Sequence, residues 1–238
     1  MNMRKYYESL GQDPFKVLPL TFHTQHGVND AEFRKFSNYF NALENKIKNS
    51  QTQLKAAIKQ YYEEKKDGTK KAKCPDDEYY DEVVDSDDED AIDKIKKKYR
   101  VPQNTWIIKP GENTNRGQGI TVVKTLRDVQ QIIGRPMRKE GDRTFIIQKY
   151  IDYPLLVHRR KFDFRCYGLL TSINGSLKGY CYQDGYVRTT SREYSLDDVS
   201  DLCVHLTNDA IQQKAEDYGK FENGNKMSFQ DFSKVISA

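Results

Sequence analysis

The sequence predicts an α+β protein built from short strands, several of them joined as hairpins, and a few amphipathic helices. Apolar runs bounded by turn residues recur from Val101 onward, as strands do. Apolar residues at spacings of three and four mark helices at 31–47 and 126–133. Asn174-Gly175 lies between two strand-like runs and is typical of a two-residue hairpin turn.

Composition excludes several classes of protein. The 238 residues suit one large domain or two small ones, and no apolar run is long enough to cross a membrane. The cysteines at 74, 166, 181 and 203 have neither metal-site nor disulfide spacing. The net charge of +4 is too small to indicate a nucleic-acid partner. The N-terminus has no apolar signal core, so we expect a cytoplasmic protein.

The first hundred residues begin with ordered elements and end in a charged segment. Residues 15–22 predict a strand with an edge or bulge at Pro19, and the aromatic face of helix 31–47 is expected in the core. Lysines flank an acidic block that runs from Asp76 to Asp93. Such blocks bury too little apolar surface to fold, so residues 64–96 are expected to be largely disordered. The opposite charges could simply pair, and a regulatory or partner-binding role is the alternative.

The remaining elements are predicted in chain order. The expected order is strands 105–109 and 120–123, helix 126–133, strand 144–151, loop 152–160, strands 161–172, 177–182 and 186–190, a short helix opened by a capping box at 195–198, and helix 209–218. Gly134 and Gly219 are expected to end the helices that precede them.

A polar loop between residues 109 and 120 predicts an anion site. Gly117 and Gly119 let the backbone turn N–H groups toward an anion, and Lys109 and Arg116 add positive charge. A nucleotide's phosphates fit that description, although the loop matches neither the P-loop nor the G-x-G-x-x-G pattern. The alternative is a glycine-rich hairpin loop with incidental basic residues.

The strand that starts at Lys161 has two different faces. Side chains alternate along a strand, so Lys161, Asp163 and Arg165 share one face, and Phe162, Phe164 and Cys166 share the other. This pattern predicts the floor of a cleft, with a solvated outer face as the alternative. A polyphosphate held between two sheets would need cations from both sides, and Lys109, Lys161, Arg165 and Arg188 are the candidates.

Eight segments carry a resemblance to a known family. They are 106–110 (Trp-Ile-Ile-Lys-Pro), 116–120 (Arg-Gly-Gln-Gly-Ile), 148–151 (Gln-Lys-Tyr-Ile), 154–156 (Pro-Leu-Leu), 161–165 (Lys-Phe-Asp-Phe-Arg), 184–189 (Asp-Gly-Tyr-Val-Arg-Thr), 205–208 (His-Leu-Thr-Asn) and 218–220 (Tyr-Gly-Lys). In this order and spacing, over about residues 101–232, the chain resembles the tubulin-tyrosine ligase-like family of the ATP-grasp superfamily. The resemblance implies an ATP-grasp fold, in which two α+β lobes with mixed or antiparallel sheets sandwich a nucleotide.

The resemblance also implies a division of the chain. Residues 1–47 would be part of the N-terminal and central lobe, and 48–100 the charged insertion or linker. Residues 101–152 would form the central lobe with its phosphate flap, and 153–238 a C-terminal lobe that is incomplete. The family's acidic strand ending in Glu-x-Asn, which holds magnesium, is expected beyond residue 238, so no metal ligand is assigned within the chain.

Site roles follow from the resemblance, position by position. Lys109 and the flap residues Arg116, Gly117, Gln118, Gly119 and Ile120 would hold the ATP phosphates. Gln148, Lys149, Tyr150 and Ile151 would line the adenine pocket, the last two through backbone hydrogen bonds. Lys161 would contact a phosphate, Asp163 the ribose, and Thr207 and Asn208 would close the site, while Arg165 and Arg188 would orient the substrate carboxylates as catalytic residues. For positions 205–208 the alternative is a buried histidine followed by a helix N-cap.

The implied reaction is ATP-dependent addition of an amino acid to tubulin carboxylates through an acyl phosphate, with Mg²⁺ as the second cofactor. Partners would be the acidic tails of tubulin or microtubules and a free amino acid. Tyrosine, glutamate and glycine use the same chemistry, with a mild preference for a polyglutamylase or polyglycylase. The expected location is the cytoskeleton, including the cilium or basal body. The alternative is a non-catalytic nucleotide- or tubulin-binding module.

Overall fold

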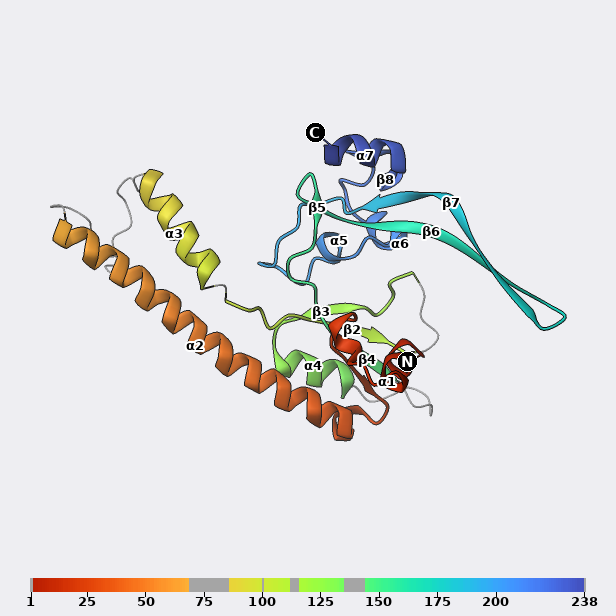
Figure 1. Cartoon of the computed structure of the whole chain (residues 1–238), viewed down its shortest axis with the longest axis horizontal. Helices are drawn as coiled ribbons and strands as arrows, with labels where there is room; N and C mark the ends of the chain where they lie inside the picture. Colours follow the sequence, from red (N-terminus) through yellow and green to blue (C-terminus); the bar gives the residue numbers. More distant parts are fainter. Residues whose placement is uncertain (1, 69–85, 100, 112–115, 135–143, 238) are drawn as a thin grey trace. The chain divides into compact units, whose positions relative to one another are not determined.

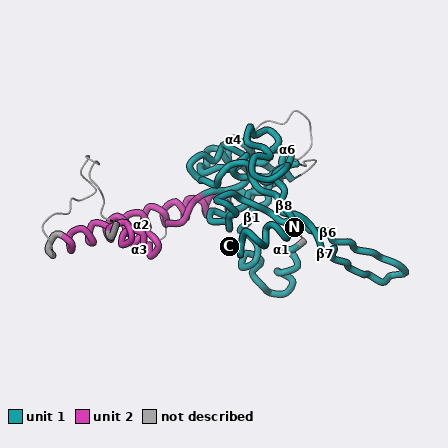
Figure 2. The backbone as a smooth tube through the Cα atoms, turned by 90° about the horizontal axis from the view of Figure 1, so that it is seen from above, with its two compact units in different colours: residues 1–34, 105–238 teal, residues 35–104 magenta. Residues whose placement is uncertain are grey.

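A computed structural model of the chain describes residues 2–68, 86–99, 101–111, 116–134 and 144–237. Two compact units are present (Figure 2). The first combines residues 1–34 with 105–238, and the second holds residues 35–104. The first unit contains two antiparallel four-stranded sheets, which confirms the predicted α+β class (Figure 1).

The first sheet has the strand order β1-β4-β2-β3. Its strands are β1 (Thr21–Thr24), β2 (Trp106–Pro110), β3 (Thr121–Val123) and β4 (Phe145–Lys149). Trp106, Ile108 and Ile147 are fully buried on one face of this sheet. Helix α4 (Leu126–Ile133) begins where the Thr125 hydroxyl caps the Asp128 amide, and it buries Val129 and Ile133. These side chains form an apolar core, which stabilises the sheet that presents the site.

The second sheet has the order β5-β6-β7-β8. Its strands are β5 (Leu156–Val157), β6 (Arg160–Ile173), β7 (Ser176–Thr189) and β8 (Lys226–Ser228). Val157, Val187, Met227 and Phe232 form its core, with Phe232 on helix α7 (Phe229–Ser237). Beyond a register shift between Cys166 and Gly168, β6 and β7 continue as a long two-stranded ribbon (Figure 1).

Short helices complete the first unit. They are α1 (Asn2–Ser9), η1 (Pro14–Lys16), η2 (Gly27–Asn29), α5 (Leu202–His205), α6 (Asp209–Gln212) and η3 (Asn223–Asn225). Helix α5 begins where the Asp201 carboxylate accepts the Cys203 amide, and Asn208 occupies the N-cap position of α6. These two short helices carry the chain past β6 and place residues 205–208 near the site.

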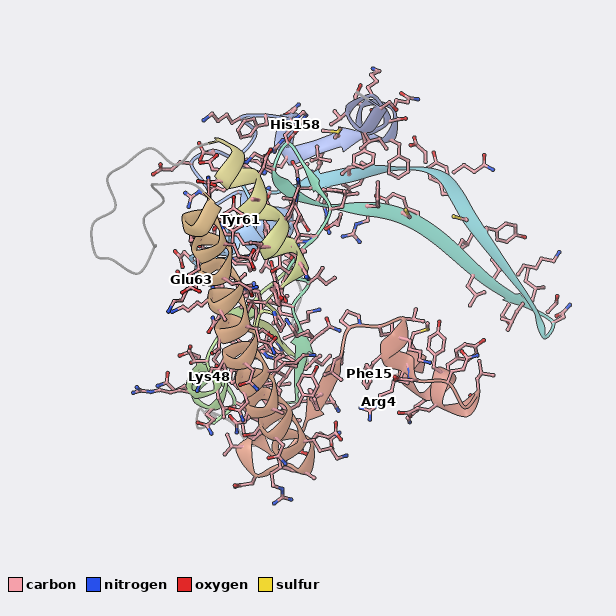
Figure 3. All side chains as sticks on the ribbon, turned by 60° about the vertical axis from the view of Figure 1, so that its left-hand side comes forward. Arg4, Phe15, Lys48, Tyr61, Glu63 and His158 are labelled. Carbon is pink, nitrogen blue, oxygen red and sulfur yellow. The ribbon has the colours of Figure 1, made fainter. Side chains whose placement is uncertain are left out.

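The second unit consists of most of helix α2 (Ala31–Gly68) and helix α3 (Ser86–Lys98). The Asp88 carboxylate joins the two helices, because it accepts hydrogen bonds from the Tyr61 hydroxyl at 2.8 Å and from the Lys65 ammonium. Figure 3 labels Tyr61 on α2. Asn104 donates to the Phe40 carbonyl at 3.2 Å and to the Glu44 carboxylate at 2.7 Å. A helical pair held by polar contacts therefore occupies much of the charged segment.

Several predicted elements differ from the structure. Helix 31–47 continues to Gly68, because apolar residues such as Leu54 and Ile58 keep the helical spacing. The strand expected at 15–22 starts only at Thr21, after a 3₁₀ turn initiated by Pro14. No helix starts at Ser195, whose hydroxyl instead closes a local turn onto the Asp197 amide at 3.0 Å.

Other predicted element boundaries also differ from those in the structure. The strands expected at 177–182 and 186–190 are one strand, β7, since the ladder with β6 continues through Gly185. The helix expected at 209–218 ends at Gln212, and turns follow it. Within the segment expected to be largely disordered, α3 is helical, and residues 69–85 lie outside the described residues.

Candidate functional site

The face of the first sheet opposite its core carries Lys109 and Gln148. Ile107 pairs with Gln148 and Lys109 with Ile146, so these four side chains share one face. The Lys109 ammonium donates to the Gln148 side-chain oxygen at 2.8 Å, and the Gln148 amide donates to the Thr21 hydroxyl at 2.9 Å. Burial lowers the pKa of Lys109. Strand pairing therefore positions a half-buried cation whose partner is neutral.

The second sheet offers Lys161 toward the same place. As predicted, Phe162 and Phe164 lie on the other face of β6, where their rings pack on Phe232 at 5.0 and 5.1 Å. The Lys161 ammonium donates to the Tyr150 hydroxyl at 2.8 Å. Burial first, and then the positive charge of Lys109, lower the pKa of Lys161 to about 8. The two lysines are therefore close enough to repel each other.

We call Lys109, Gln148, Tyr150 and Lys161 the cationic cradle. Among the described residues, neither lysine forms an ion pair with a carboxylate. Two half-buried like charges without a counter-charge are unfavourable, because burial and repulsion both penalise the charged forms. An anion placed between them would remove both penalties.

Lys149 lies on the opposite face from the cradle. Its ammonium donates to the Asp152 carboxylate at 2.7 Å and to the Thr105 carbonyl at 3.1 Å. Burial raises the pKa of Asp152 in spite of this ion pair. The Tyr150 amide donates to the Thr105 carbonyl at 3.1 Å, so that amide is already used. Ile151 is exposed, and its carbonyl accepts a long hydrogen bond of 3.5 Å from the Tyr194 hydroxyl.

Asp163, Arg188 and Thr207 form a second polar cluster on the cradle side of β6. The Arg188 guanidinium donates two hydrogen bonds to the Asp163 carboxylate, at 2.9 and 2.6 Å, and these bonds raise the pKa of Arg188. The Thr207 hydroxyl donates to the same carboxylate. Arg165, two residues further along β6, is exposed and pairs across the ladder with Tyr186. Arg188 is thus held rigidly, whereas Arg165 remains open to solvent.

The flap has the backbone that its glycines predicted. Arg116, Gly117 and Gly119 have φ angles of 55°, 80° and 73°, in the left-handed region. A Cβ on Gly117 would lie 3.1 Å from the Asn208 side-chain oxygen, and one on Gly119 would lie 2.8 Å from Pro110. Gln118 is exposed and Ile120 half-buried, while residues 112–115 lie outside the described residues. The flap therefore approaches Asn208 closely.

Sequence patterns did not predict the contacts of the Tyr150 side chain. Its hydroxyl lies 2.9 Å from His205 Nδ1, and His205 Nε2 lies 3.0 Å from the Asp198 carbonyl. His205 is buried, which confirms the alternative proposed for it, and burial lowers its pKa. Tyr194 also faces the site, with its ring centroid 5.5 Å from the Lys161 ammonium. No pattern along the chain could reveal these contacts, because they join residues from separate elements.

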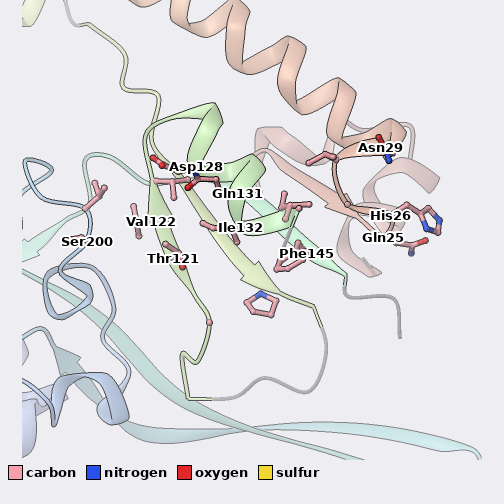
Figure 4. A pocket seen from close by; sticks show the side chains of 18 residues that line it. Gln25, His26, Asn29, Thr121, Val122, Asp128, Gln131, Ile132, Phe145 and Ser200 are labelled. Carbon is pink, nitrogen blue, oxygen red and sulfur yellow. The ribbon is translucent and has the colours of Figure 1, made fainter. Parts of the chain in front are cut away.

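A cavity of about 830 Å³ lies elsewhere in the first unit, between η2, β3 and α4 (Figure 4). It touches the base of the flap at Pro110 and Gly119 but includes neither lysine of the cradle. Its lining is largely apolar or neutral, with Asp128 and His26 as its titratable groups. The cradle, not this cavity, has the charge arrangement that an anion requires, so we place the candidate site at the cradle.

The described part of the chain contains neither a metal cluster nor a membrane-spanning helix. No three His, Cys, Asp or Glu side chains gather there as a metal site. No helix in that part is both long and apolar enough to span a bilayer.

The fold and the cradle define a class of protein. Two antiparallel sheets of an α+β unit bring Lys109 and Lys161 near each other, and a glycine flap follows Lys109 in the chain. The chain belongs to the tubulin-tyrosine ligase family, whose model matches residues 28–237. Membership implies an ATP-grasp fold and the use of ATP and Mg²⁺.

Curated relatives agree with this assignment. The chain is 38% identical over 127 residues to a tubulin glycylase of Drosophila melanogaster, which covers 52% of this chain and 16% of that protein. It is 34% identical over 143 residues to a probable alpha-tubulin polyglutamylase of Tetrahymena thermophila, covering 57% of this chain and 34% of that protein. A tubulin monoglycylase of Homo sapiens is 37% identical over 115 residues, which cover 48% of this chain and 14% of that protein. The matched segments thus span about a third or less of these relatives.

Proposed function

We propose that the chain binds ATP at the cationic cradle and belongs to a ligase that joins an amino acid to carboxylates of tubulin. The observation that carries this proposal is the pair of half-buried lysines, one from each sheet, that have no carboxylate partner among the described residues. A triphosphate supplies the negative charge that this arrangement lacks. The names of the relatives, which are glycylases and polyglutamylases, support the choice of reaction.

ATP fits the residues of the cradle. Lys109 and Lys161 would contact its phosphates from opposite sheets, and the flap at 116–120 would cover them with backbone N–H groups. Gln148 and the backbone of Ile151 would face the base. Mg²⁺ neutralises a triphosphate when bound, but the described residues offer no ligand set for it. The proposed contacts with ATP are therefore made by side chains and backbone groups of this chain.

The proposed reaction has two steps. A carboxylate oxygen of the acceptor takes the γ-phosphoryl group of ATP, which forms an acyl phosphate and releases ADP. The amine of the incoming amino acid then attacks the acyl carbon, the amide bond forms, and phosphate and a proton leave. The enzyme must mainly position anions and stabilise the charge on the transferring group. Both tasks suit cations held in fixed places.

Asp163, Arg188 and Arg165 would act on the substrate side. Arg188 is oriented by its two hydrogen bonds to Asp163, and its other N–H groups remain for a substrate carboxylate. Arg165 is exposed on the same face, where it would attract an acidic peptide. Thr207 and Asn208 would close the site beneath the flap. Glycine or glutamate is the preferred amino acid, in line with the relatives named above.

One experiment tests both binding and turnover. The purified chain is incubated with ATP, Mg²⁺, tubulin and radiolabelled glycine, glutamate or tyrosine in turn, and ATP affinity is measured in parallel. Incorporation of one amino acid supports the ligase. ATP binding without incorporation of any amino acid supports the alternative of a non-catalytic nucleotide- or tubulin-binding module. Failure to bind ATP would refute the proposed site altogether.

A further inference from the structure

Four groups form a continuous chain of hydrogen bonds behind the cradle. The Lys161 ammonium contacts the Tyr150 hydroxyl at 2.8 Å, which contacts His205 Nδ1 at 2.9 Å. His205 Nε2 contacts the carbonyl of Asp198 at 3.0 Å. The chain thus joins the end of the first sheet to β6 and to helix α5. Its anchor is a backbone carbonyl, which can only accept.

The direction of every proton in this chain follows from that anchor. Because the Asp198 carbonyl accepts, His205 Nε2 must carry a hydrogen and donate it. A neutral His205 then has an unprotonated Nδ1, which accepts the hydrogen of the Tyr150 hydroxyl. The lone pairs of that hydroxyl are left for Lys161, whose ammonium can only donate. Burial of His205 lowers its pKa, which agrees with the neutral form.

Packing fixes the rings of the chain. His205 and Tyr150 are 3% and 5% exposed, so neither ring can move freely. Tyr150 and Tyr194 meet the imidazole edge-on, with centroids 5.6 and 6.1 Å away. The Lys161 ammonium lies 4.4 Å from the centroid of the Tyr150 ring and 5.5 Å from that of Tyr194. Two aromatic faces and one hydroxyl therefore hold the ammonium.

The charged and titratable surroundings of this chain come from several elements. The charge of Lys109 on β2 disfavours the charged form of Lys161, and Lys161 in turn disfavours a charged His205. Asp198 and Asp201, before α5, favour the charged form of His205 more weakly than burial opposes it. Tyr150 and Tyr194 have pKa values raised, first by burial, so both remain protonated.

We propose that His205 is a positioning residue for the cradle: it fixes the Tyr150 hydroxyl as an acceptor, and that hydroxyl holds the Lys161 ammonium ready for an anionic phosphate. Neither side chain needs to touch the ligand. The identity of the anion rests on the proposed function, but the hydrogen-bond chain does not. The two claims can therefore be tested separately.

The first measurement follows Lys161 itself and uses no nucleotide. The full chain is trace-labelled with acetic anhydride over pH 6–11, and mass spectrometry gives the rate at Lys161. A midpoint near pH 8 is expected for the unmodified chain. Tyr150→Phe should lower the midpoint by about half to one pH unit, because the ammonium loses its acceptor. His205→Leu should lower it in the same direction, because the Tyr150 hydroxyl loses the Nδ1 that draws its hydrogen away from Lys161. His205→Asn keeps an acceptor near the Nδ1 position and should stay close to the unmodified value.

Each outcome decides the proposal. An unchanged midpoint in Tyr150→Phe would show that the hydroxyl does not hold the ammonium. Equal midpoints in His205→Leu and His205→Asn would show that no acceptor at position 205 matters. If His205 had a purely structural role, its variants would have a lower melting temperature but an unchanged labelling midpoint at Lys161. Tyr150→Phe keeps the buried ring, so it provides the test even if a His205 variant fails to fold.

The second measurement is ATP affinity of the same variants. Tyr150→Phe and His205→Leu should bind about fivefold to tenfold more weakly, and His205→Asn within about twofold of the unmodified chain. If the unmodified chain binds no ATP, the proposed function fails while the labelling experiment still tests the positioning role. If ATP binds but the variants bind equally well, the positioning role fails alone.

Discussion

Two neighbouring residues on β6, the buried Arg160 and the half-buried Lys161, are cations with opposite surroundings. Arg160 is 1% exposed and forms two hydrogen bonds with the Glu222 carboxylate, and it also donates to the Thr190 carbonyl at 3.0 Å. Lys161 points to the other face and has a tyrosine hydroxyl as its partner. The first cation is neutralised by a carboxylate, although its buried Nε has no hydrogen-bond partner, whereas the second has no carboxylate partner among the described residues. One strand thus carries a paired cation and a cation without a carboxylate partner on opposite faces, and only the second is suited to the binding role that we propose.

The pKa values of Glu222 and Lys161 show the same contrast between a paired and an unpaired charge. Burial tends to raise the pKa of Glu222, but the hydrogen bonds from Arg160 and Thr189 outweigh it and lower that pKa. At Lys161 nothing outweighs burial and the charge of Lys109. A paired charge is stabilised in its charged form, and an unpaired one is not.

The largest expected effect is on stability, from Arg160→Met. This change leaves the Glu222 carboxylate buried without its cation, so the free energy of unfolding should fall by about 3–5 kcal/mol in urea denaturation. The double variant Arg160→Met/Glu222→Met removes both charges and should regain most of the loss. A single variant as stable as the unmodified chain would contradict the structural role of this pair.

Lys161→Met should weaken ATP binding without lowering the stability of the fold. ATP affinity is expected to fall about 10- to 100-fold, since a charged hydrogen bond to phosphate is lost. The free energy of unfolding should not fall, because a desolvated and repelled cation is replaced by an apolar chain of similar length. Lys178→Met, at an exposed position on β7, is the matched control and should change neither quantity. Loss of stability in Lys161→Met would mean that Lys161 is as well satisfied as Arg160.

The pH dependence sharpens the comparison further. The pKa of Lys161 is about 8, below its ordinary 10.5, so the lysine loses its charge as pH rises through 8. ATP affinity should therefore decrease by up to about fivefold from pH 8 to pH 9, as the charged fraction of this lysine falls. The folded chain binds fewer protons than the unfolded chain between these two pKa values, so this lysine contributes stability that increases with pH there. Lys161→Met should remove the part of both trends that centres near pH 8 and leave the part that comes from Lys109, whose pKa is also lowered by burial. An affinity that stays flat up to pH 10 in the unmodified chain would refute the prediction.

The smallest effect concerns the flap. Gly119→Ala adds a Cβ that would lie 2.8 Å from Pro110, at a φ of +73°, so the flap must shift. ATP affinity should fall a few-fold, with a cost in stability of about 1 kcal/mol. Gly175→Ala has a similar φ of +78° with nothing within 4 Å, so it isolates the backbone strain from the clash. Gly175→Ala should lower the free energy of unfolding without changing ATP affinity. Equal ATP affinity in both variants would show that the flap does not contact the nucleotide.

Much of the local structure was predictable because it depends on neighbours in the chain. Helix α4 matches its predicted range of 126–133, and Asn174-Gly175 forms the expected turn with φ angles of 49° and 78°. Alternation along β6 placed Phe162 and Lys161 on the correct opposite faces. The second half of α2 was missed because the density of charge masked its helical spacing. The short helix α5 was misplaced because Asp201, not Ser195, caps it.

The sequence by itself determined that this chain is an α+β protein with a glycine flap and lysines on separate strands, because periodicity and turn chemistry act over a few residues. Only the tertiary structure decided which lysines meet. Lys149 follows Gln148 directly, yet it lies on the other face with Asp152, while Lys109 and Lys161 approach each other from different sheets. Distances between residues far apart in the chain depend on how the strands pair and pack, so the hydrogen-bond chain through Tyr150 and His205 appears only in the folded protein.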